Sequence, residues 1–240
     1  MILDCSSYDS AKKSLVRIFG VKEEELAATL SSLSPYGGDQ PPEEYIYNSV
    51  CEAFGGPSED VSVIWFHGTR VEDGTLFNER GILPKSSARE LIEPRLKELA
   101  EGLDSSGNNP FSLSLSGKQG PHDEGPFAFL IKDVAIQAPG ENHSYVEVPE
   151  IVEDIAGALL GENYSHLVER FQEVATPYIV SFLADSKGYE VAHALWFLKL
   201  VEDGESEIDA GSTANTFFSS EGSTILPEKI QCVEPIETVQ

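Results

Sequence analysis

The sequence predicts an α+β protein in which helices flank short strands. Two kinds of pattern support this. Short runs rich in β-branched and aromatic residues, bounded by turn formers, predict strands at residues 61–66, 111–116, 127–136, 178–184 and 230–233. Apolar residues at helical spacing predict helices at residues 10–18, 22–33, 45–54, 87–99, 148–160 and 164–174. With 40% hydrophobic residues among 240, the chain can bury a substantial core.

The stretch of residues 60–84 is the most informative part of the sequence. Val61 to Phe66 is apolar on both faces, which is typical of a strand that is covered on both sides. We expect the strand to end there, so that His67, Gly68 and Thr69 form a turn and the imidazole reaches a cleft. Gly68 has no Cβ, which allows a ligand close to its peptide groups. Residues 74–81 then predict a short helix that ends at Gly81.

The string Trp65-Phe66-His67-Gly68-Thr69-Arg70, followed by Gly81-Ile82-Leu83, resembles the first NAD-binding element of the ADP-ribosyltransferase superfamily. The similarity is to its histidine-glycine branch, which includes diphtheria toxin and the poly-ADP-ribose polymerases. It implies split mixed sheets around an NAD cleft, with flanking helices. It also implies that His67 binds a ribose hydroxyl, that the Gly68 backbone binds the carboxamide, and that Thr69 and Arg70 belong to the NAD site. The alternative interpretation of His67 is a histidine at the end of a strand that is hydrogen-bonded within the protein and binds no ligand.

A second pattern is the strict alternation of residues 111–116, Phe-Ser-Leu-Ser-Leu-Ser. Because side chains alternate across a strand, Ser112, Ser114 and Ser116 would share one face. This row of hydroxyls resembles the serine-bearing second strand of the same superfamily, which implies that it lines the NAD cleft. An edge strand with a solvated face explains the pattern equally well.

The C-terminal stretch supplies the remaining candidates. Phe217 and Phe218 follow a small, polar segment that we expect to be flexible, and Glu221 opens a strand-like run. This order is similar to the end of ADP-ribosyltransferase domains, which implies that the two phenylalanines recognise the target and that Glu221 is catalytic. Ser219 occupies the position where arginine-modifying toxins have an acid or amide. Glu221 could instead be one more solvated acid.

The expected chemistry explains these residue types. Cleavage of NAD at its nicotinamide bond builds positive charge on the ribose, as glycoside hydrolysis does. A carboxylate beside that sugar stabilises the charge and can take a proton from the incoming nucleophile. Neither a metal nor a redox cofactor is required. The stacking tyrosine of the histidine branch is missing, and Phe127, Phe129, Tyr178 or an aromatic residue of the target-recognition loop would have to replace it.

Composition limits the partners. Lys and Arg number 16 against 41 Asp and Glu, a formal charge of −25. Such a charge repels nucleic acid and anionic membranes and serves solubility, although a basic protein target would suit it. Cys5, Cys51 and Cys232 are far apart and are expected to be free thiols in a reducing compartment. We expect a cytoplasmic site of action, either in the producing cell or after delivery into a host cytosol.

The predicted organisation is an N-terminal helical extension over residues 1–58 and an ADP-ribosyltransferase-like domain over residues 59–240. Residues 148–175 would be a helical insertion that affects specificity. Three functions follow as hypotheses. The first is a mono-ADP-ribosyltransferase that modifies a protein. The second is an RNA 2′-phosphotransferase of the same fold, which the charge disfavours. The third is a catalytically inactive domain that binds a partner through its acidic surface or through Phe217 and Phe218.

Overall fold

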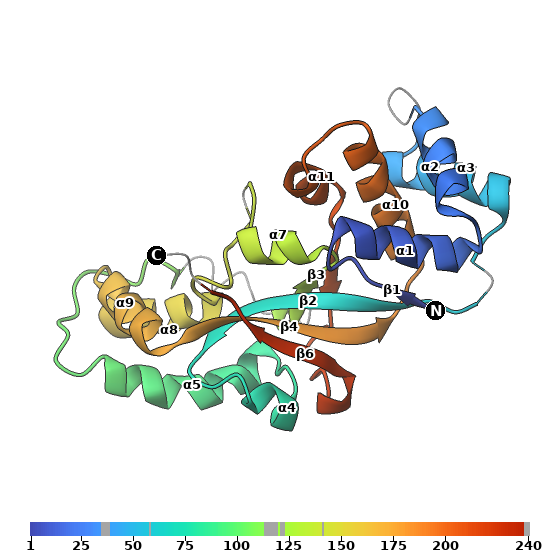
Figure 1. The fold of residues 1–240 in the computed structure, drawn as a ribbon. Coiled ribbons are helices and arrows are strands. Elements are labelled where there is room, and N and C mark those ends of the chain that lie inside the picture. The colour runs from blue at the N-terminus through green and yellow to red at the C-terminus, as the bar shows by residue number, and fades with distance from the viewer. Residues whose placement is uncertain (35–38, 58, 113–119, 121–122, 141, 238–240) are drawn as a thin grey trace. The chain divides into compact units, whose positions relative to one another are not determined.

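The computed structural model describes residues 1–34, 39–57, 59–112, 120, 123–140 and 142–237 (Figure 1). The chain forms two compact units, each assembled from three segments. Unit 1 consists of Met1–Phe66, Phe129–Asn142 and Leu183–Phe217. Unit 2 consists of His67–Ala128, His143–Phe182 and Phe218–Gln240. No helix among the described residues combines the length and apolarity needed to cross a membrane.

The described strands join in a single six-stranded sheet with the order β5-β3-β2-β4-β6, and β1 pairs with β2. Their bounds are β1 Ile2–Leu3, β2 Ser62–Val71, β3 Phe127–Phe129, β4 Thr176–Asp185, β5 Phe217–Ser219 and β6 Ile230–Pro235. β1 runs parallel to β2, whereas the β2–β3 and β4–β6 pairs are antiparallel. The mixed α/β character agrees with the prediction, but the expected division into two sheets is not seen in this part of the chain.

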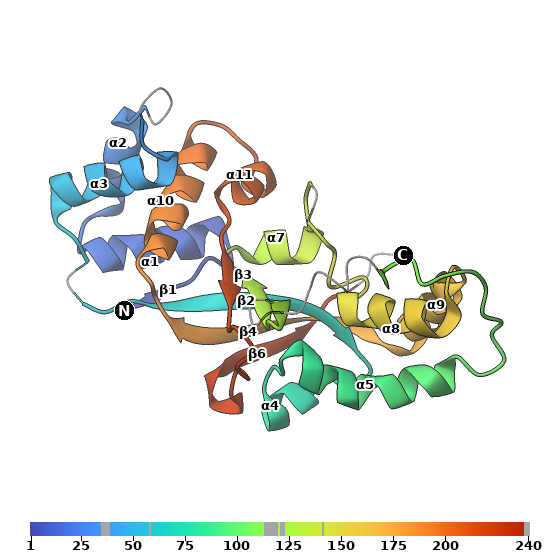
Figure 2. The same cartoon turned by 180° about the vertical axis from the view of Figure 1, so that it is seen from behind.

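Unit 1 is organised around the helix α10, Tyr189–Glu202. Its other helices are α1 Tyr8–Phe19, α2 Glu23–Ser32, α3 Pro42–Phe54, α7 Lys132–Gln137 and α11 Glu207–Ala214. α1, α2, α3 and α11 all pack on α10 (Figure 2). The sequence left residues 189–201 undecided between helix and strand. Because α10 is covered from several sides, it is apolar around most of its circumference, which removes the amphipathic pattern that marks a helix.

Two expectations for unit 1 were wrong. The strand predicted over residues 127–136 ends at Phe129, because the Asn215 side chain accepts hydrogen bonds from the amides of Leu130 and Ile131, at 3.1 and 3.2 Å. The segment before Phe217, expected to be flexible, contains α11. Ser206 caps this helix, since its Oγ accepts a hydrogen bond from Asp209 N at 3.2 Å.

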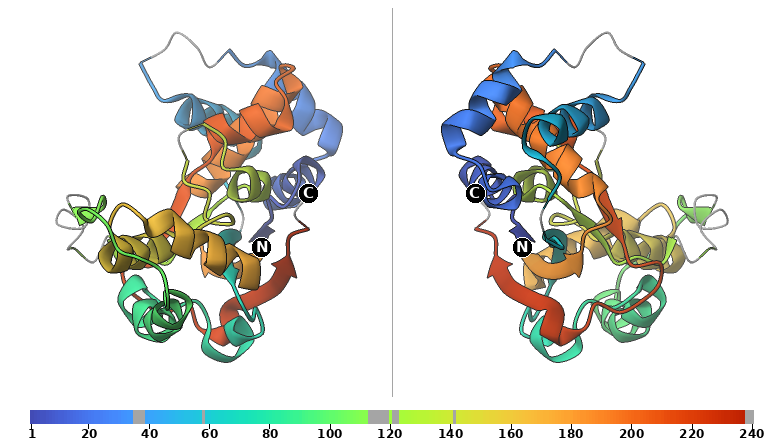
Figure 3. Two further views of the ribbon diagram at one scale, coloured as in Figure 1. Left: turned by 90° about the vertical axis from the view of Figure 1, so that its left-hand side faces the viewer. Right: turned by 90° about the vertical axis from the view of Figure 1, so that its right-hand side faces the viewer.

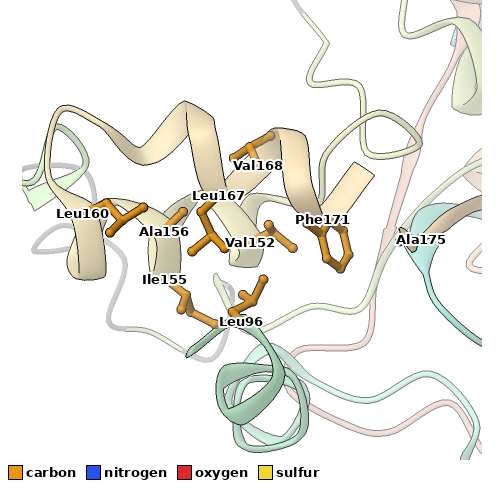
Figure 4. Packing of buried hydrophobic residues seen from close by; sticks show 9 residues of the cluster. All are labelled: Leu96, Val152, Ile155, Ala156, Leu160, Leu167, Val168, Phe171 and Ala175. Atoms are coloured by element: carbon orange, nitrogen blue, oxygen red, sulfur yellow. The ribbon is translucent and has the colours of Figure 1, made fainter. Parts of the chain in front are cut away.

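Unit 2 contains the helices α4 Leu76–Arg80, α5 Lys85–Leu99, α8 Glu150–Leu160 and α9 Tyr164–Val174, together with the 3-10 turn η2 Pro227–Lys229. α5, α8 and α9 pack against one another (Figure 3). Figure 4 shows their shared apolar core, in which Leu96 of α5 faces Ile155 of α8, with Leu167 and Phe171 of α9 close by. The predicted helices at 87–99, 148–160 and 164–174 are thus confirmed.

The strand predicted at residues 111–116 is wrong where it can be checked. Phe111 lies in a turn and Ser112 is helical, whereas residues 113–119 lie outside the described part of the chain. The cause is Asn109. Its side chain accepts a hydrogen bond from the Phe111 amide at 2.9 Å, and its carbonyl accepts one from the Ser112 amide at 3.3 Å. Phe111 then packs edge-on against Tyr164, with ring centroids 4.9 Å apart.

Candidate functional site

The His-Gly-Thr sequence lies inside a strand and not in a turn. β2 continues to Val71, so the expected strand end at Phe66 was placed too early. Thr69 and Val71 are β-branched and favour this continuation. In unit 2 the strand presents a half-buried His67, a buried Gly68, a buried Thr69 and a buried Arg70.

The His67 imidazole is held in one tautomer. Its Nδ1 lies 2.7 Å from the carbonyl oxygen of Phe127. A carbonyl only accepts hydrogen bonds, so Nδ1 carries the proton and Nε2 carries a lone pair in the neutral ring. Burial lowers the pKa of His67 below its ordinary value, although the Phe127 carbonyl partly opposes this. The ring is therefore neutral at pH 7, and its Nε2 accepts a hydrogen bond from a hydroxyl or amine.

A cavity of about 440 Å³ opens beside this part of β2, and every residue that lines it belongs to unit 2. His67, Thr69 and Arg70 contribute from β2, and most of the remaining wall is apolar. The apolar residues come from α4, α5, the segment between them and the α8–α9 pair, and include Leu76, Phe77, Ile82, Leu91, Ile92, Ile151 and Phe171. The volume falls in the range of small-molecule and cofactor sites, which are about 300–1,000 Å³.

Charged side chains also line the cavity. Arg95 Nε donates to Glu72 Oε1 at 2.7 Å, and Arg95 Nη1 donates to Glu98 at 3.0 Å. Arg80 is exposed and, within the described ranges, has no ion-pair partner. Asp73 accepts hydrogen bonds from the amide and hydroxyl of Thr75, which lower the pKa of its carboxyl group. The charged residues that line the cavity are therefore of both signs: Arg70, Arg80 and Arg95, together with Glu72 and Asp73.

Arg70 is largely engaged with the backbone. Its Nε donates to Val146 O at 3.1 Å, and its Nη1 donates to Gln172 O at 3.2 Å and to Ala175 O at 2.9 Å. Only 8% of the residue is exposed. Through these three bonds the guanidinium contacts both the segment before α8, at Val146, and the C-terminal end of α9, at Gln172 and Ala175.

The segment Gly125–Phe127 connects His67 to the turn that contains Glu221. Phe127 O binds His67, as described above. One residue earlier, Pro126 O accepts a hydrogen bond from Ser220 N at 3.2 Å. Gly125 O accepts hydrogen bonds from Ser220 Oγ at 2.6 Å and from Gly222 N at 2.9 Å. Because β3 lies between β2 and β5, these two strands are about 10 Å apart.

Glu221 occupies an exposed turn and not the strand that was expected. Ser223 N donates to Ser220 O at 3.1 Å and closes the turn, whose central residues Glu221 and Gly222 have φ angles of 54° and 87°. Glycine and asparagine adopt such angles readily, whereas glutamate rarely does. Strained backbone conformations of this kind cluster at functional sites. Glu221 is not among the residues that line the cavity.

The other predicted site residues are dispersed. Ser112 is exposed and helical, and Ser114 and Ser116 lie outside the described residues. Phe217, in unit 1, is 53% exposed and packs edge-on against Phe129 at 5.1 Å. Phe218, in unit 2, is half-buried and packs against Phe182 at 5.1 Å.

Several lining residues were not found from the sequence. Ile151 and Phe171 lie in stretches that were predicted only as helices, because apolar spacing does not distinguish residues that fill a core from residues that line a cavity. Leu76 and Leu91 are large apolar residues that remain 39% and 50% exposed. One indication of the role of Ile151 and Phe171 came from the sequence: the helices predicted over residues 148–175 were interpreted as an insertion into the domain that affects specificity. Tyr178, a candidate for the missing stacking tyrosine, lies against Gly74, where an added Cβ would be 2.6 Å from its ring.

In the part of the chain that the structure describes, no three His, Cys, Asp or Glu residues are grouped as metal ligands. Comparison of the chain with protein-family models, with curated proteins and with solved structures gave no match.

Proposed function

We propose that the protein is an NAD-dependent mono-ADP-ribosyltransferase that modifies a protein target. The resemblance of residues 65–70 to the NAD-binding element suggests this activity. The observation that carries the proposal is that Gly125–Phe127 binds both His67 and the Glu221 turn. Two residues 154 positions apart, one a neutral hydrogen-bond acceptor and one a carboxylate, thereby flank a single short segment of unit 2.

The cavity suits the non-reacting part of NAD. His67 Nε2 would accept a hydrogen bond from a ribose hydroxyl, since that atom carries a lone pair. The apolar walls would cover a base, and Arg80 would attract the pyrophosphate, because a guanidinium matches the geometry of phosphate oxygens. Binding at several points would hold the reacting ribose in one orientation.

Glu221 would act on the reacting ribose. The bond between C1′ and the nicotinamide nitrogen breaks, and nicotinamide leaves with the electron pair. The ribose then carries positive charge, which a nearby carboxylate stabilises. A nucleophile of the target protein bonds to C1′ and loses its proton, for which Glu221 is the candidate base. The exposure of the turn allows a protein to approach it.

The test uses NAD labelled on its adenylate part, a protein extract, and three forms of the full chain. We expect the wild type to transfer label to protein and Glu221→Gln to lose transfer by about a hundredfold or more, the size of effect seen when one group that stabilises transition-state charge is removed. Glu228→Gln is the matched control, since it removes an exposed acid of the same C-terminal segment. Equal transfer by wild type and Glu221→Gln would contradict the proposal.

Glu221→Gly separates the backbone from the carboxylate. Glycine adopts a positive φ without strain, so we expect the free energy of unfolding to rise by roughly 0.5–1 kcal/mol while transfer is lost. Chemical denaturation measures the first quantity and label transfer the second. A fall in stability would show that the glutamate side chain holds the fold, which would remove the argument from its backbone conformation.

A catalytically inactive binding domain is the second candidate, because Glu221 does not line the cavity. In that case the protein would bind NAD or ADP-ribose in calorimetry, but neither the wild type nor Glu221→Gln would release nicotinamide. Transfer of phosphate from a 2′-phosphorylated RNA to NAD would instead identify an RNA 2′-phosphotransferase.

A further inference from the structure

We infer that Arg70 is a positioning residue, which fixes the α8–α9 pair as one wall of the cavity and so determines how tightly NAD binds. The inference rests on the function proposed above. It changes the role first expected for Arg70, from direct contact with NAD to support of the wall.

The bonds of Arg70 join both ends of the helix pair. Val146 precedes α8, whereas Gln172 and Ala175 lie at the C-terminal end of α9, and Arg70 donates to the carbonyl oxygens of all three. The last carbonyls of a helix have no partner within the helix and carry partial negative charge, so a guanidinium stabilises them. Gln172 adds a second bond between these two ends, since its Nε2 donates to Glu147 O at 3.2 Å.

The helix pair contributes directly to the cavity. Pro149 and Ile151 at the start of α8 and Phe171 in α9 line it, and they face residues from α4 and α5. Phe171 is only 2% exposed and also belongs to the core shared with α5 (Figure 4). Movement of α9 would therefore shift Phe171 and change the width of the cavity, whereas the Gly125–Phe127 segment holds the Glu221 turn independently of α9.

Arg170 provides a matched control. It is an arginine of α9 whose Nη1 donates to two backbone carbonyls, Leu99 O at 2.8 Å and Glu101 O at 3.0 Å. Arg170 thus bonds to the C-terminal end of α5, in the same way that Arg70 bonds to the C-terminal end of α9. Unlike Arg70, Arg170 does not line the cavity. The two arginines make the same kind of bond in the same unit, but only Arg70 joins the two ends of the α8–α9 pair.

The experiment compares Arg70→Met, Arg70→Lys and Arg170→Met in the full chain. Hydrogen exchange is measured at Ala175 N, which bonds to Phe171 O at the end of α9, and at Ala100 N, which bonds to Leu96 O at the end of α5. We expect Arg70→Met to lose protection at Ala175 and Arg170→Met to lose it at Ala100. In steady-state kinetics with NAD, we expect Arg70→Met to raise KM about tenfold and to leave kcat within about twofold of the wild type. In Arg70→Lys, KM should return part of the way to the wild-type value. In Arg170→Met, KM should be unchanged.

Each outcome decides the inference. An unchanged KM in Arg70→Met, or an equal rise in Arg170→Met, would overturn it, because the effect would then not come from the wall. A fall in kcat without a change in KM would also overturn it. If the wild type neither binds nor consumes NAD, the proposed function is wrong, and hydrogen exchange alone decides whether Arg70 positions the wall. Retained protection of the Ala175 amide in Arg70→Met would then overturn the positioning role. Loss of protection at Ala175 and not at Ala100 would support it.

Discussion

The two units use their buried charges differently. In unit 1, Glu190 accepts hydrogen bonds from the amides of Lys187 and Gly188 at the start of α10, and Lys199 pairs with Asp203 one turn along the same helix. In unit 2, Arg70 reaches carbonyls 76 to 105 residues away, and Lys85 of α5 pairs with Asp154 of α8 at 2.5 Å. The buried charges of unit 1 therefore stabilise their own helix, whereas those of unit 2 join separate elements around a cavity.

The comparison teaches where substitutions should affect function. A local pair can be lost without moving another element, because water or a neighbouring group replaces it. A pair that joins two elements determines their spacing as well as their stability. We therefore expect unit 2 to be the part of the chain in which stability and ligand binding change together.

The largest contrast is between two lysines. Lys85→Met leaves Asp154, whose side chain is 6% exposed, charged without this partner, and removal of one member of a buried pair costs about 3–5 kcal/mol. Lys199→Met leaves Asp203, whose side chain is 40% exposed and can be solvated, so we expect a loss of about 1 kcal/mol or less. Urea denaturation of both variants measures the difference. The double substitution Lys85→Met with Asp154→Leu should recover much of the loss, and comparable losses in the two single variants would remove the contrast.

The next effect compares two glycines that both have a positive φ angle. An alanine Cβ at Gly81, where φ is 72°, would lie 1.9 Å from the carbonyl oxygen of Ile225. At Gly20, where φ is 65°, a Cβ would meet no atom within 4 Å. We expect Gly20→Ala to cost about 1 kcal/mol, from the left-handed conformation alone. We expect Gly81→Ala to cost about 3 kcal/mol or more, because its ψ of −160° belongs to a region that is essentially restricted to glycine and the contact with Ile225 adds to that cost.

The same pair of variants tests the site. Ile82 and Ile225 bridge the end of α4 to the C-terminal segment through mutual backbone hydrogen bonds of 2.9 Å. Displacement of this bridge should weaken NAD turnover in Gly81→Ala and leave it unchanged in Gly20→Ala. Equal stability of the two variants would show that the contact with Ile225 relaxes without cost.

The smallest effect is the pH dependence that His67 confers. Its pKa is lowered in the folded chain, so between its ordinary value of 6.5 and the lowered value the unfolded chain binds more protons. Stability then falls as the pH falls through this window, by about 1.4 kcal/mol for each pKa unit of difference. We expect His67→Gln to flatten the stability profile below pH 6.5 relative to the wild type, as measured by urea denaturation at a series of pH values. An identical slope in both proteins would contradict the lowered pKa of His67 and the neutral charge assigned to it.

Much of the secondary structure could be predicted from local patterns. The helices α5, α8 and α9 have apolar residues at helical spacing, and Gly81 ends α4 with its positive φ as expected. Prediction failed where a distant group or an overlooked local cap intervened. Asn215 ends β3 by binding the amides of Leu130 and Ile131, which are 85 and 84 residues earlier in the chain. Asn109 diverts Phe111 from the expected strand, and Ser206 begins an unexpected helix; both were local signals.

The candidate site was predictable only in part. His67, Thr69 and Arg70 were chosen from sequence, and they do line the cavity. Ile151 and Phe171 could not be chosen, because an apolar stripe has the same periodicity whether it faces a core or a cavity. The role of Arg70 was also hidden, since the identity of a residue does not show which backbone carbonyls it reaches.

By itself, the sequence determined the helices with regular apolar spacing, the strand over residues 61–66 that leads into His67, and a charge that disfavours nucleic acid and anionic membranes. The tertiary structure alone decided the neutral tautomer of His67, the bonds of Arg70 to both ends of the α8–α9 pair, and the left-handed turn of Glu221. The physical reason is the distance along the chain over which each interaction acts. Periodicity and caps act within a few residues, whereas these three features depend on hydrogen bonds and packing between segments that are far apart in the chain.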